Sequence, residues 1–272
     1  MSSRITELDS LYNDLEKQST RFLLEAMNAL DRTVPEAVSQ ALPAIEALVE
    51  SIVPKFEQGG RIFYMGSGTS GRLGIVDASE CPPTFGVPDG RVVGIIAGGD
   101  AAIRKAQEGA EDNTEAGWQD LQAFAPTEKD TLVGLSASGS TPYVLGALQY
   151  AREAGINTGC IVCNPNSSIA AAAQWPVVIV VGPEFITGST RLKSGTAQKL
   201  ALNMLTTTVM IRTGRVSGNR MVDMQLTNAK LEDRGTRYVA EATGLKMEDA
   251  RTWLMLYSNV RSAVEAWEAS LE

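Results

Sequence analysis

Five short apolar runs alternate with helix-forming stretches through the middle of this 272-residue chain, and this alternation is its most constraining feature. The runs lie at residues 61–65, 92–96, 132–135, 160–163 and 177–181. Each is apolar almost throughout, which is typical of parallel strands that are covered on both faces. The stretches between them, at residues 70–78, 101–122, 141–154 and 167–173, are long enough for crossover helices. We therefore expect an α/β fold in which helices flank a doubly wound, five-stranded parallel sheet.

Helical segments are predicted on both sides of this sheet region. Within residues 36–57, apolar side chains recur every three or four positions and make one apolar helix face. Residues 194–212 predict a central helix with little polar surface, and the chain beyond residue 220 is charged and helix-forming. We therefore expect an N-terminal helical segment at 1–35, a sheet domain at 36–220 and a small C-terminal helical tail at 221–272.

Composition excludes several classes of chemistry. The chain has no His, so it has no Ser-His-Asp triad, Cys-His dyad or histidine metal ligand. Its three Cys are too few for a disulfide framework or a four-thiolate zinc site, and they fit a reducing cytoplasm. We expect no metal site. A net charge of −8 argues against nucleic-acid or membrane-surface partners, because both are polyanions.

Targeting and membrane signals are also missing from the pattern. The first residues are polar and acidic and lack the apolar core of a signal peptide. The longest uncharged apolar-leaning run, Leu200–Ile211, is too short to span a bilayer. We therefore expect a soluble, cytoplasmic protein.

Two loops that are rich in glycine and hydroxyl groups follow the first and third apolar runs. The first contains Gly66, Ser67, Gly68, Thr69 and Ser70, and the second contains Ser136, Ser138, Gly139, Ser140 and Thr141. Each follows a predicted strand and opens a helix, at the carboxyl edge of the sheet where ligands bind. Glycine admits a ligand close to the backbone, and a helix N-terminus offers free N–H groups. We predict a phosphate site built from these loops.

A nucleotide site is the alternative interpretation of the first loop. Gly66, Gly68 and Gly71 partly match a dinucleotide fingerprint. However, no acidic residue closes the second predicted strand to bind a ribose, since Gly98-Gly99 follow it, and no Walker lysine is present. The paired loops therefore favour a phosphosugar over a nucleotide.

Resemblance to a known family rests on these loops and on longer motifs. The pattern S-x-S-G-x-T, from Ser136 to Thr141, resembles a sugar isomerase (SIS) domain, which binds phosphosugars. Further segments resemble the N-acetylmuramic acid 6-phosphate etherase family: 77–86, 96–99, 108–112, 187–193, 195–199, 221–223 and 227–231. The similarity covers about residues 36–235. It implies an SIS-type fold, a phosphosugar substrate and no cofactor.

The resemblance implies that N-acetylmuramic acid 6-phosphate and water give N-acetylglucosamine 6-phosphate and D-lactate. An ether at C3 departs readily only when C2 is deprotonated, and C2–H is acidic only beside the C1 aldehyde of an opened sugar. Elimination of lactate and addition of water therefore need one base and one acid near the same ring edge. The resemblance assigns Glu111 as the base and Glu80 as the acid. Glu80 is expected to follow a helix and to be held by a stiff turn at Pro82-Pro83.

Other binding residues are less sharply defined by the sequence. Many family members carry Arg in S-G-R-T-P-Y, where this chain has Ser140, so another cation must neutralise the phosphate if that Arg does so. Lys193 is the candidate. Glu184 and Lys193 lie beyond the fifth apolar run, where a sugar hydroxyl or the lactyl carboxylate would be bound; a structural ion pair is the alternative.

Two other functions stay open for this fold. A non-catalytic phosphosugar sensor, similar to the glucokinase regulator, would bind without turnover. An aldose-ketose isomerase of the SIS type commonly uses a His, which this chain lacks. We also expect a homodimer with the site near the subunit interface, because the apolar helices at 36–57 and 194–212 would then find a partner.

Overall fold

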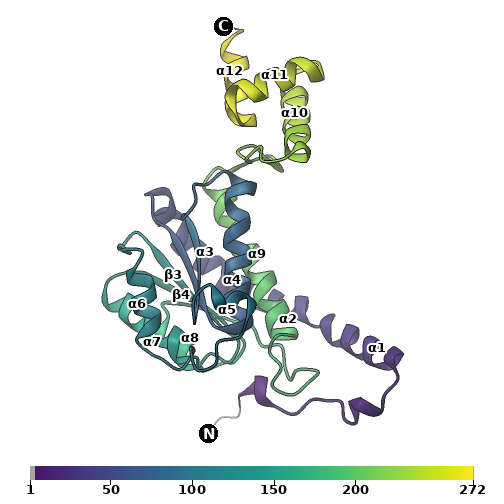
Figure 1. The fold of residues 1–272 in the computed structure, drawn as a ribbon, viewed down its shortest axis with the longest axis vertical. Coiled ribbons are helices and arrows are strands. Elements are labelled where there is room, and N and C mark those ends of the chain that lie inside the picture. The colour runs from purple at the N-terminus through teal and green to yellow at the C-terminus, as the bar shows by residue number, and fades with distance from the viewer. Residues whose placement is uncertain (1–3, 272) are drawn as a thin grey trace. The chain divides into compact units, whose positions relative to one another are not determined.

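The computed structural model describes residues 4–271, which divide into two compact units (Figure 1). The sheet unit comprises the chain up to Ala78 together with Val92–Thr206. The helical unit comprises Ser79–Arg91 together with the chain from Thr207 onward. The three segments expected from the sequence, 1–35, 36–220 and 221–272, stay a prediction.

A five-stranded parallel sheet forms the centre of the sheet unit, as the apolar runs predict. Its spatial order is β2-β1-β3-β4-β5. The strands are β1 (Ile62–Gly66), β2 (Val92–Ile96), β3 (Thr131–Ser136), β4 (Asn157–Val162) and β5 (Trp175–Val178). The prediction was wrong for the fifth strand, which begins and ends earlier than the apolar run at 177–181. Its pairing ends at Val178 because β4, its partner, ends at Val162.

Helices cover both faces of this sheet (Figure 1). The helices of the sheet unit are α1 (Thr20–Asp31), α2 (Val34–Gln40), α3 (Leu42–Glu57), α5 (Ala101–Arg104), α6 (Ala116–Gln122), α7 (Pro142–Glu153) and α8 (Ser168–Ala172), with 3-10 turns η1 (Ile5–Glu7) and η2 (Leu15–Lys17). Two longer helices, α4 (Gly68–Phe85) and α9 (Lys193–Arg212), contribute residues to both units. The helix predicted at 194–212 is therefore confirmed.

Glycines in the strands let the helices approach the sheet closely. A Cβ atom on Gly134 would lie 2.6 Å from the side chain of Val144 on α7, so α7 packs directly on β3. On the other face, a Cβ on Gly159 would lie 2.4 Å from Leu48 on α3. The apolar face of α3 is therefore covered by the sheet of its own chain and is not open to a second copy.

One predicted helix and one predicted turn differ from the structure. The helix expected over 101–122 is interrupted, because Gly109 has a φ of +75° and residues 105–109 present no apolar face to the core. The stiff turn expected at Pro82-Pro83 is also wrong, because α4 continues through both prolines to Phe85. The carbonyl of Pro82 accepts a hydrogen bond from Gly86 N at 2.9 Å, which completes the last turn of that helix.

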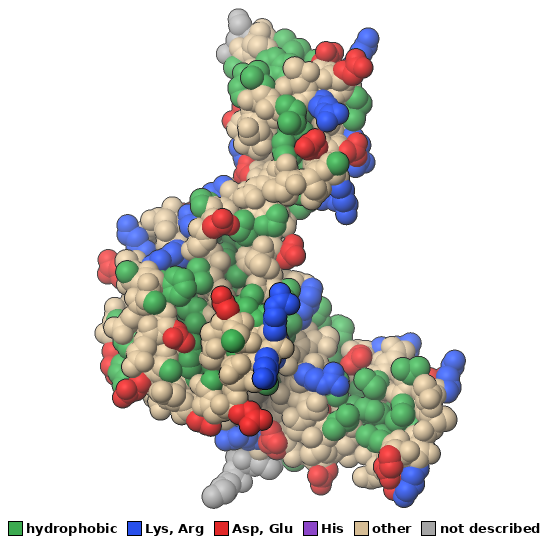
Figure 2. Space-filling model, in the orientation of Figure 1, with side chains coloured by type: hydrophobic (Ala, Val, Ile, Leu, Met, Phe, Trp, Pro, Cys, Tyr) green, Lys and Arg blue, Asp and Glu red, His purple; other side chains and the backbone are tan. Residues whose placement is uncertain are grey.

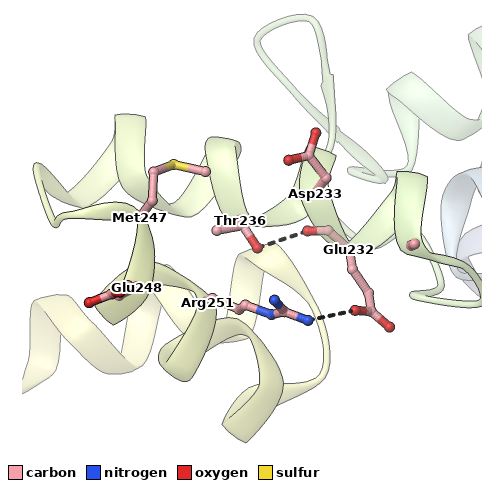
Figure 3. A pocket seen from close by; sticks show the side chains of 7 residues that line it. Glu232, Asp233, Thr236, Met247, Glu248 and Arg251 are labelled. Carbon is pink, nitrogen blue, oxygen red and sulfur yellow. Dashed lines mark hydrogen bonds and ion pairs between the residues drawn. The ribbon is translucent and has the colours of Figure 1, made fainter.

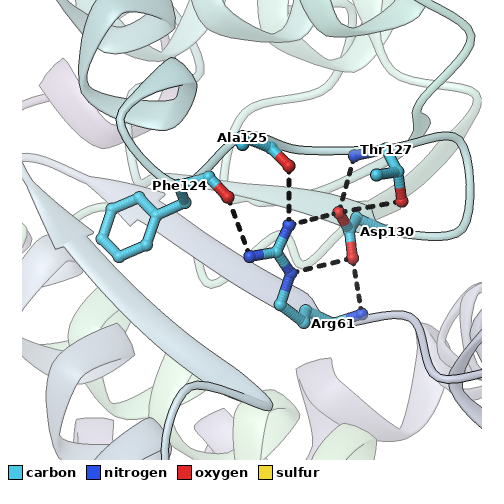
Figure 4. Close-up of polar contacts among 5 residues, drawn as sticks. All are labelled: Arg61, Phe124, Ala125, Thr127 and Asp130. Atoms are coloured by element: carbon cyan, nitrogen blue, oxygen red, sulfur yellow. Dashed lines mark hydrogen bonds and ion pairs between the residues drawn. The ribbon is translucent and has the colours of Figure 1, made fainter.

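An ion pair joins β1 to the segment before β3 at the amino end of the strands (Figure 4). Arg61 donates from Nε and a terminal nitrogen to the two oxygens of Asp130, at 3.1 and 2.8 Å. Its guanidinium also donates to the carbonyls of Phe124 and Ala125. Burial alone would raise the pKa of Asp130, but hydrogen bonds from Arg61 and Thr127 hold this pKa below its ordinary value. This cluster fixes the register of the two strands that carry the glycine-rich loops.

The helical unit has its own apolar core. Its elements beyond α9 are a small hairpin, β6 (Val216–Ser217) and β7 (Arg220–Met221), followed by α10 (Ala229–Thr243), α11 (Met247–Tyr257) and α12 (Val260–Ala269). Asn228 caps α10 by accepting a hydrogen bond from Leu231 N, and Gly244, with a φ of +76°, ends it. Val239, Ala250 and Leu254 are fully buried between these helices. Within residues 4–271, no helix is both long and apolar enough to cross a membrane.

Candidate active site

Strands β1 and β3 lie side by side in the sheet although β2 separates them in the sequence. The chain leaves β1 toward β2 on one side and leaves β3 toward β4 on the other, which makes this pair the switch point of the sheet. Ligands of open parallel sheets bind at the carboxyl end of such a pair. Both glycine-rich loops predicted from the sequence begin there: the β1 loop (residues 66–71) and the β3 loop (residues 136–141).

The β1 loop makes one contact with an acidic side chain. The Ser67 hydroxyl donates a hydrogen bond to Oε2 of Glu111 at 2.6 Å. These residues are 44 positions apart, so the fold brings together two groups that the sequence nominated separately. The contact places the Glu111 carboxylate beside the opening of α4.

Glu111 lies in the irregular segment between α5 and α6 and is itself exposed. Its backbone carbonyl accepts a hydrogen bond from Tyr143 N, at the start of α7, at 3.0 Å. Arg72 holds the other end of the segment, donating to the carbonyls of Ala102 and Ile103 at 2.7 and 2.8 Å. A cavity of about 310 Å³ lies among Ser67, Arg72 and Glu111. Glu111 therefore faces open space while its backbone is held.

Hydroxyl groups of the β3 loop bond one another. The Ser136 and Thr141 hydroxyls lie 2.9 Å apart, and those of Ser138 and Ser140 lie 3.1 Å apart. Gly139 N donates to Ser136 Oγ at 3.1 Å, and Gly139 itself has a φ of +70°. The loop is thus a preformed set of donors at the N-terminus of α7, an arrangement that suits a phosphate group.

Other predicted residues in the β1 loop have structural contacts. Gly66 permits close approach, because a Cβ there would lie 2.7 Å from Gly71 N. The buried Ser70 hydroxyl donates to Gln198 Oε1 on α9 at 2.8 Å. Thr69 packs near Gly195, since a Cβ on that glycine would lie 3.3 Å from its methyl group. These contacts fix the β1 loop against the start of α9.

Glu184 and Lys193 are buried at the N-terminus of α9. Glu184 is 0% exposed and accepts hydrogen bonds from Lys193 N, Ser194 N and the Ser194 hydroxyl. Lys193 is 4% exposed and donates from Nζ to the Val181 carbonyl at 2.5 Å. Burial lowers the pKa of Lys193, although the nearby Glu184 opposes this shift. Their assignment as substrate-binding residues stays a prediction, and their contacts within the chain are those of a helix cap.

Glu80 lies within α4 and is exposed. By contact it belongs to the helical unit, whereas Glu111 belongs to the sheet unit. Its role as the acid that acts with Glu111 therefore stays a prediction.

A second carboxylate on α4 is partly buried, three positions before Glu80. Asp77 accepts hydrogen bonds from the Thr206 hydroxyl at 3.0 and 2.9 Å. Burial raises the pKa of Asp77 to about 6, although hydrogen bonds from Thr206 and Tyr64 and the charge of Lys199 oppose the shift. Sequence reasoning missed Asp77, because burial of a single acid on a helix depends on what packs against it.

Asn164 is a further residue that the sequence did not nominate. It follows β4, and its side-chain Nδ2 donates to the Ser138 carbonyl at 3.1 Å and to the Thr6 hydroxyl at 2.8 Å. It therefore connects the β3 loop to the N-terminal segment. An asparagine after a strand carries no local signal of such a contact, which spans 158 positions to Thr6.

A cavity in the helical unit has a different character (Figure 3). Its lining includes Glu232, Asp233, Glu248 and Arg251, and the Arg251 guanidinium donates to Glu232 at 3.4 Å. With three carboxylates and one guanidinium, the lining has a net negative charge, which repels an anionic ligand. Among residues 4–271, no group of three or more acidic or Cys side chains lies close enough together to hold a metal ion.

Known proteins resemble this chain along most of its length. Residues 44–152 match the glucokinase regulatory protein N-terminal SIS domain, and residues 114–208 match the SIS domain. A phosphoheptose isomerase from Francisella tularensis shares the fold with a TM-score of 0.52, at 16% identity, over 69% of this chain and 98% of its own. The SIS-type α/β fold expected from the sequence is therefore confirmed.

Two curated relatives are much closer in sequence. The N-acetylmuramic acid 6-phosphate etherase of Porphyromonas gingivalis is 58% identical over 98% of this chain and 97% of its own length. The etherase of the same name from Bacteroides fragilis is 56% identical over 98% of this chain and 95% of its own. At this identity and coverage, the chain belongs to the N-acetylmuramic acid 6-phosphate etherase family.

Proposed function

We propose that this protein is a lyase that cleaves the D-lactyl ether of N-acetylmuramic acid 6-phosphate in the recycling of cell-wall sugars. The products are N-acetylglucosamine 6-phosphate and D-lactate. The observation that carries the proposal is the 2.6 Å contact between Ser67 and Glu111 at the switch point where the β3 loop also opens. This arrangement offers an anion site and a carboxylate at one edge of the sheet. Identities of 58% and 56% to etherases over 98% of the chain support the substrate.

The reaction needs a proton to be removed from C2 and one to be added to the ether oxygen. We assign the base to Glu111, because its carboxylate faces a cavity and is oriented by the Ser67 hydroxyl. We assign the acid to Glu80, on α4. The C2–H bond breaks in the opened sugar, its electrons form the C2–C3 double bond, and lactate leaves C3 as its oxygen is protonated. Water then adds at C3 and a proton returns to C2.

The β3 loop would hold the phosphate through this sequence. Its hydroxyls are mutually hydrogen-bonded and keep their positions before the ligand arrives, so little ordering accompanies binding. We assign Ser136, Ser138, Gly139, Ser140 and Thr141 to this contact, with residues 66–69 on the opposite side. Ser70, whose hydroxyl bonds Gln198, would position this loop rather than touch the ligand.

The direct test is incubation with N-acetylmuramic acid 6-phosphate in ¹⁸O-water. The proposal expects D-lactate release with label on C3 of the sugar product, and deuterium at C2 in parallel runs in D₂O. Label in the lactate hydroxyl would show that the ether is cleaved by hydrolysis at the lactyl carbon and not by elimination. Tight binding without any release of lactate would show that the protein is a phosphosugar sensor and not an enzyme.

We also propose that the protein acts as a homodimer in the cytoplasm. Hydrophobic side chains gather over α1 (Figure 2), where Phe22 and Leu24 are 40% and 62% exposed. An exposed apolar helix of this kind suits a second copy. Light scattering after gel filtration tests this: a dimer that Leu24→Ser converts to a monomer supports it. The three buried, free cysteines agree with a reducing compartment.

A further inference from the structure

The β3 loop supplies hydroxyl and backbone donors to an anion but no cation of its own. A sugar phosphate is largely a dianion near neutral pH, and this chain has a net charge of −8. Without a local positive charge, the field of the protein opposes the ligand. A cation close to the loop would offset this field, and Ser140 does not provide one.

A cavity beside the β3 loop contains a candidate from a distant part of the chain. It has a volume of about 260 Å³ and is lined by Arg4, Ile5, Ser138, Ser140 and residues 164–168. Arg4 is the only charged side chain among the described residues that line it. Two loop hydroxyls and one guanidinium thus share a single cavity.

The position of Arg4 is fixed by the segment that follows it. Thr6 is 0% exposed, and its backbone N–H donates to Asn164 Oδ1 at 3.2 Å. Asn164 returns a hydrogen bond from Nδ2 to the Thr6 hydroxyl and donates from the same group to the Ser138 carbonyl. One amide side chain therefore holds both the N-terminal segment and the β3 loop.

A second anchor follows a few residues later. Ser10 donates from its hydroxyl to the Phe185 carbonyl at 2.7 Å and from its backbone to the Thr187 hydroxyl at 2.9 Å. Residues 6–10 are therefore attached at both ends. Arg4 lies two positions from the Asn164 contact, and it lines the cavity beside the β3 loop.

Lys193 is the competing cation, and its contacts are with its own chain. Its ammonium group donates to the Val181 carbonyl, and burial lowers its pKa. Arginine stays charged at any physiological pH and presents a planar fork that matches phosphate oxygens. The exposed guanidinium of Arg4 is therefore better suited than Lys193 to a ligand held by the β3 loop.

We propose that Arg4 is a specificity-determining residue that binds the phosphate of the sugar. The contact between Thr6 and Asn164 holds Arg4 beside the β3 loop. The inference rests on the proposed function for the identity of the sugar, but the binding of a phosphorylated ligand is independent of turnover. It predicts that the N-terminal segment discriminates phosphosugars from neutral sugars.

Calorimetry with N-acetylglucosamine 6-phosphate tests the proposal without catalysis. Arg4→Gln should weaken binding about tenfold or more, as expected for loss of a charged hydrogen-bonding partner, and should reduce its salt dependence. Arg4→Lys should recover part of the affinity. Arg237→Gln is the matched control, because Arg237 is an exposed arginine on α10 that pairs with Asp233; it should bind as the wild type does.

A rescue experiment separates a direct charge contact from an indirect effect. Introducing Ser140→Arg into the Arg4→Gln protein puts a guanidinium back beside the same hydroxyls and should restore affinity for the phosphosugar. Unchanged binding in Arg4→Gln overturns the proposal even if lactate is released by the wild type. Weakened binding that Ser140→Arg restores supports it even if no lactate is ever released.

Discussion

The two loops at the switch point contain the same residue types, but their side chains make different contacts. In the β3 loop, the hydroxyls bond one another, and those of Ser138 and Ser140 also line a cavity. In the β1 loop, Ser67 reaches outward to the Glu111 carboxylate and Ser70 turns inward to Gln198. One loop is organised before any ligand arrives, whereas the other orients the carboxylate that we propose as the base. Under the proposed function, binding and chemistry are therefore divided between neighbouring strand ends.

The largest expected effect separates chemistry from binding. Glu111→Gln keeps the shape of the side chain and an oxygen for Ser67, but removes the base, so kcat should fall by about 10² or more with little change in KM. Glu115→Gln, an exposed acid four positions later that does not line this cavity, is the control. Near wild-type turnover in Glu111→Gln would show that the β1 loop does not orient the base.

The proposed acid has a separate test. Glu80→Gln should also lower kcat by about 10² or more, but the variant should still exchange C2–H with solvent, because its base is intact.

A second pair of variants compares one glycine from each loop. Gly139 and Gly68 both have positive φ angles, +70° and +52°. A Cβ on Gly139 would lie 2.4 Å from the Ser167 side chain, whereas a Cβ on Gly68 meets nothing within 4 Å. Gly139→Ala should abolish detectable phosphosugar binding, while Gly68→Ala should cost only the backbone strain of about 1–2 kcal/mol. Equal effects in denaturant titrations and calorimetry would show that the β3 loop is no more constrained than the β1 loop.

Serine substitutions should show a smaller difference of the same kind. Ser138→Ala removes a partly exposed donor from the β3 loop, so binding of the phosphosugar should weaken about tenfold or more, matching roughly 1.5–3 kcal/mol for a hydrogen bond to a charged group. Ser70→Ala removes a buried contact to Gln198 and should lower the melting temperature with KM nearly unchanged. If Ser70→Ala weakened phosphosugar binding and Ser138→Ala lowered only the melting temperature, the phosphate site would be in the β1 loop and not in the β3 loop.

The smallest effect concerns the helix that opens from the β1 loop. The pKa of Asp77 is raised to about 6 from an ordinary value near 3.8, so the folded protein binds this proton more tightly than the unfolded chain. Its contribution to stability is full below about pH 4 and is lost as pH rises through 6. The difference in unfolding free energy between wild type and Asp77→Asn should change over this interval. A difference that is flat with pH would show that Asp77 titrates normally.

Local patterns predicted the sheet and both loops well because each depends on neighbouring residues. The run at 92–96 matches β2 residue for residue, and the glycine-rich segments open α4 and α7 as expected. The fifth strand was misplaced because an apolar run does not reveal where its partner ends. The break between α5 and α6 was missed although Gly109 offered a signal, since Ala- and Glu-rich stretches favour helix by composition.

Contacts between distant residues were beyond sequence reasoning. Nothing near Asn164 indicates that it bonds both Ser138 and Thr6, and nothing near Glu184 indicates that it caps α9. The contacts of Asn164 form only when β3 and β4 pair in the sheet and the N-terminal segment reaches them. The contacts of Glu184 are only nine and ten positions away, but they depend on how the loop before α9 folds back. The residue types at the site were therefore predictable, and the contacts that hold them were not.

The attachment of Thr6 to Asn164 also sets an order of events during synthesis. The two residues are 158 positions apart, and the Ser10 anchor at Phe185 is 175 positions away. At a few residues per second, the N-terminal segment waits many seconds after it leaves the ribosome before its binding surface exists. The β3 loop is synthesised before Asn164, the residue that tethers it to the N-terminal segment. A nascent chain that stalls after β3 will therefore contain both loops of the switch point but not the segment that joins the N-terminus to them.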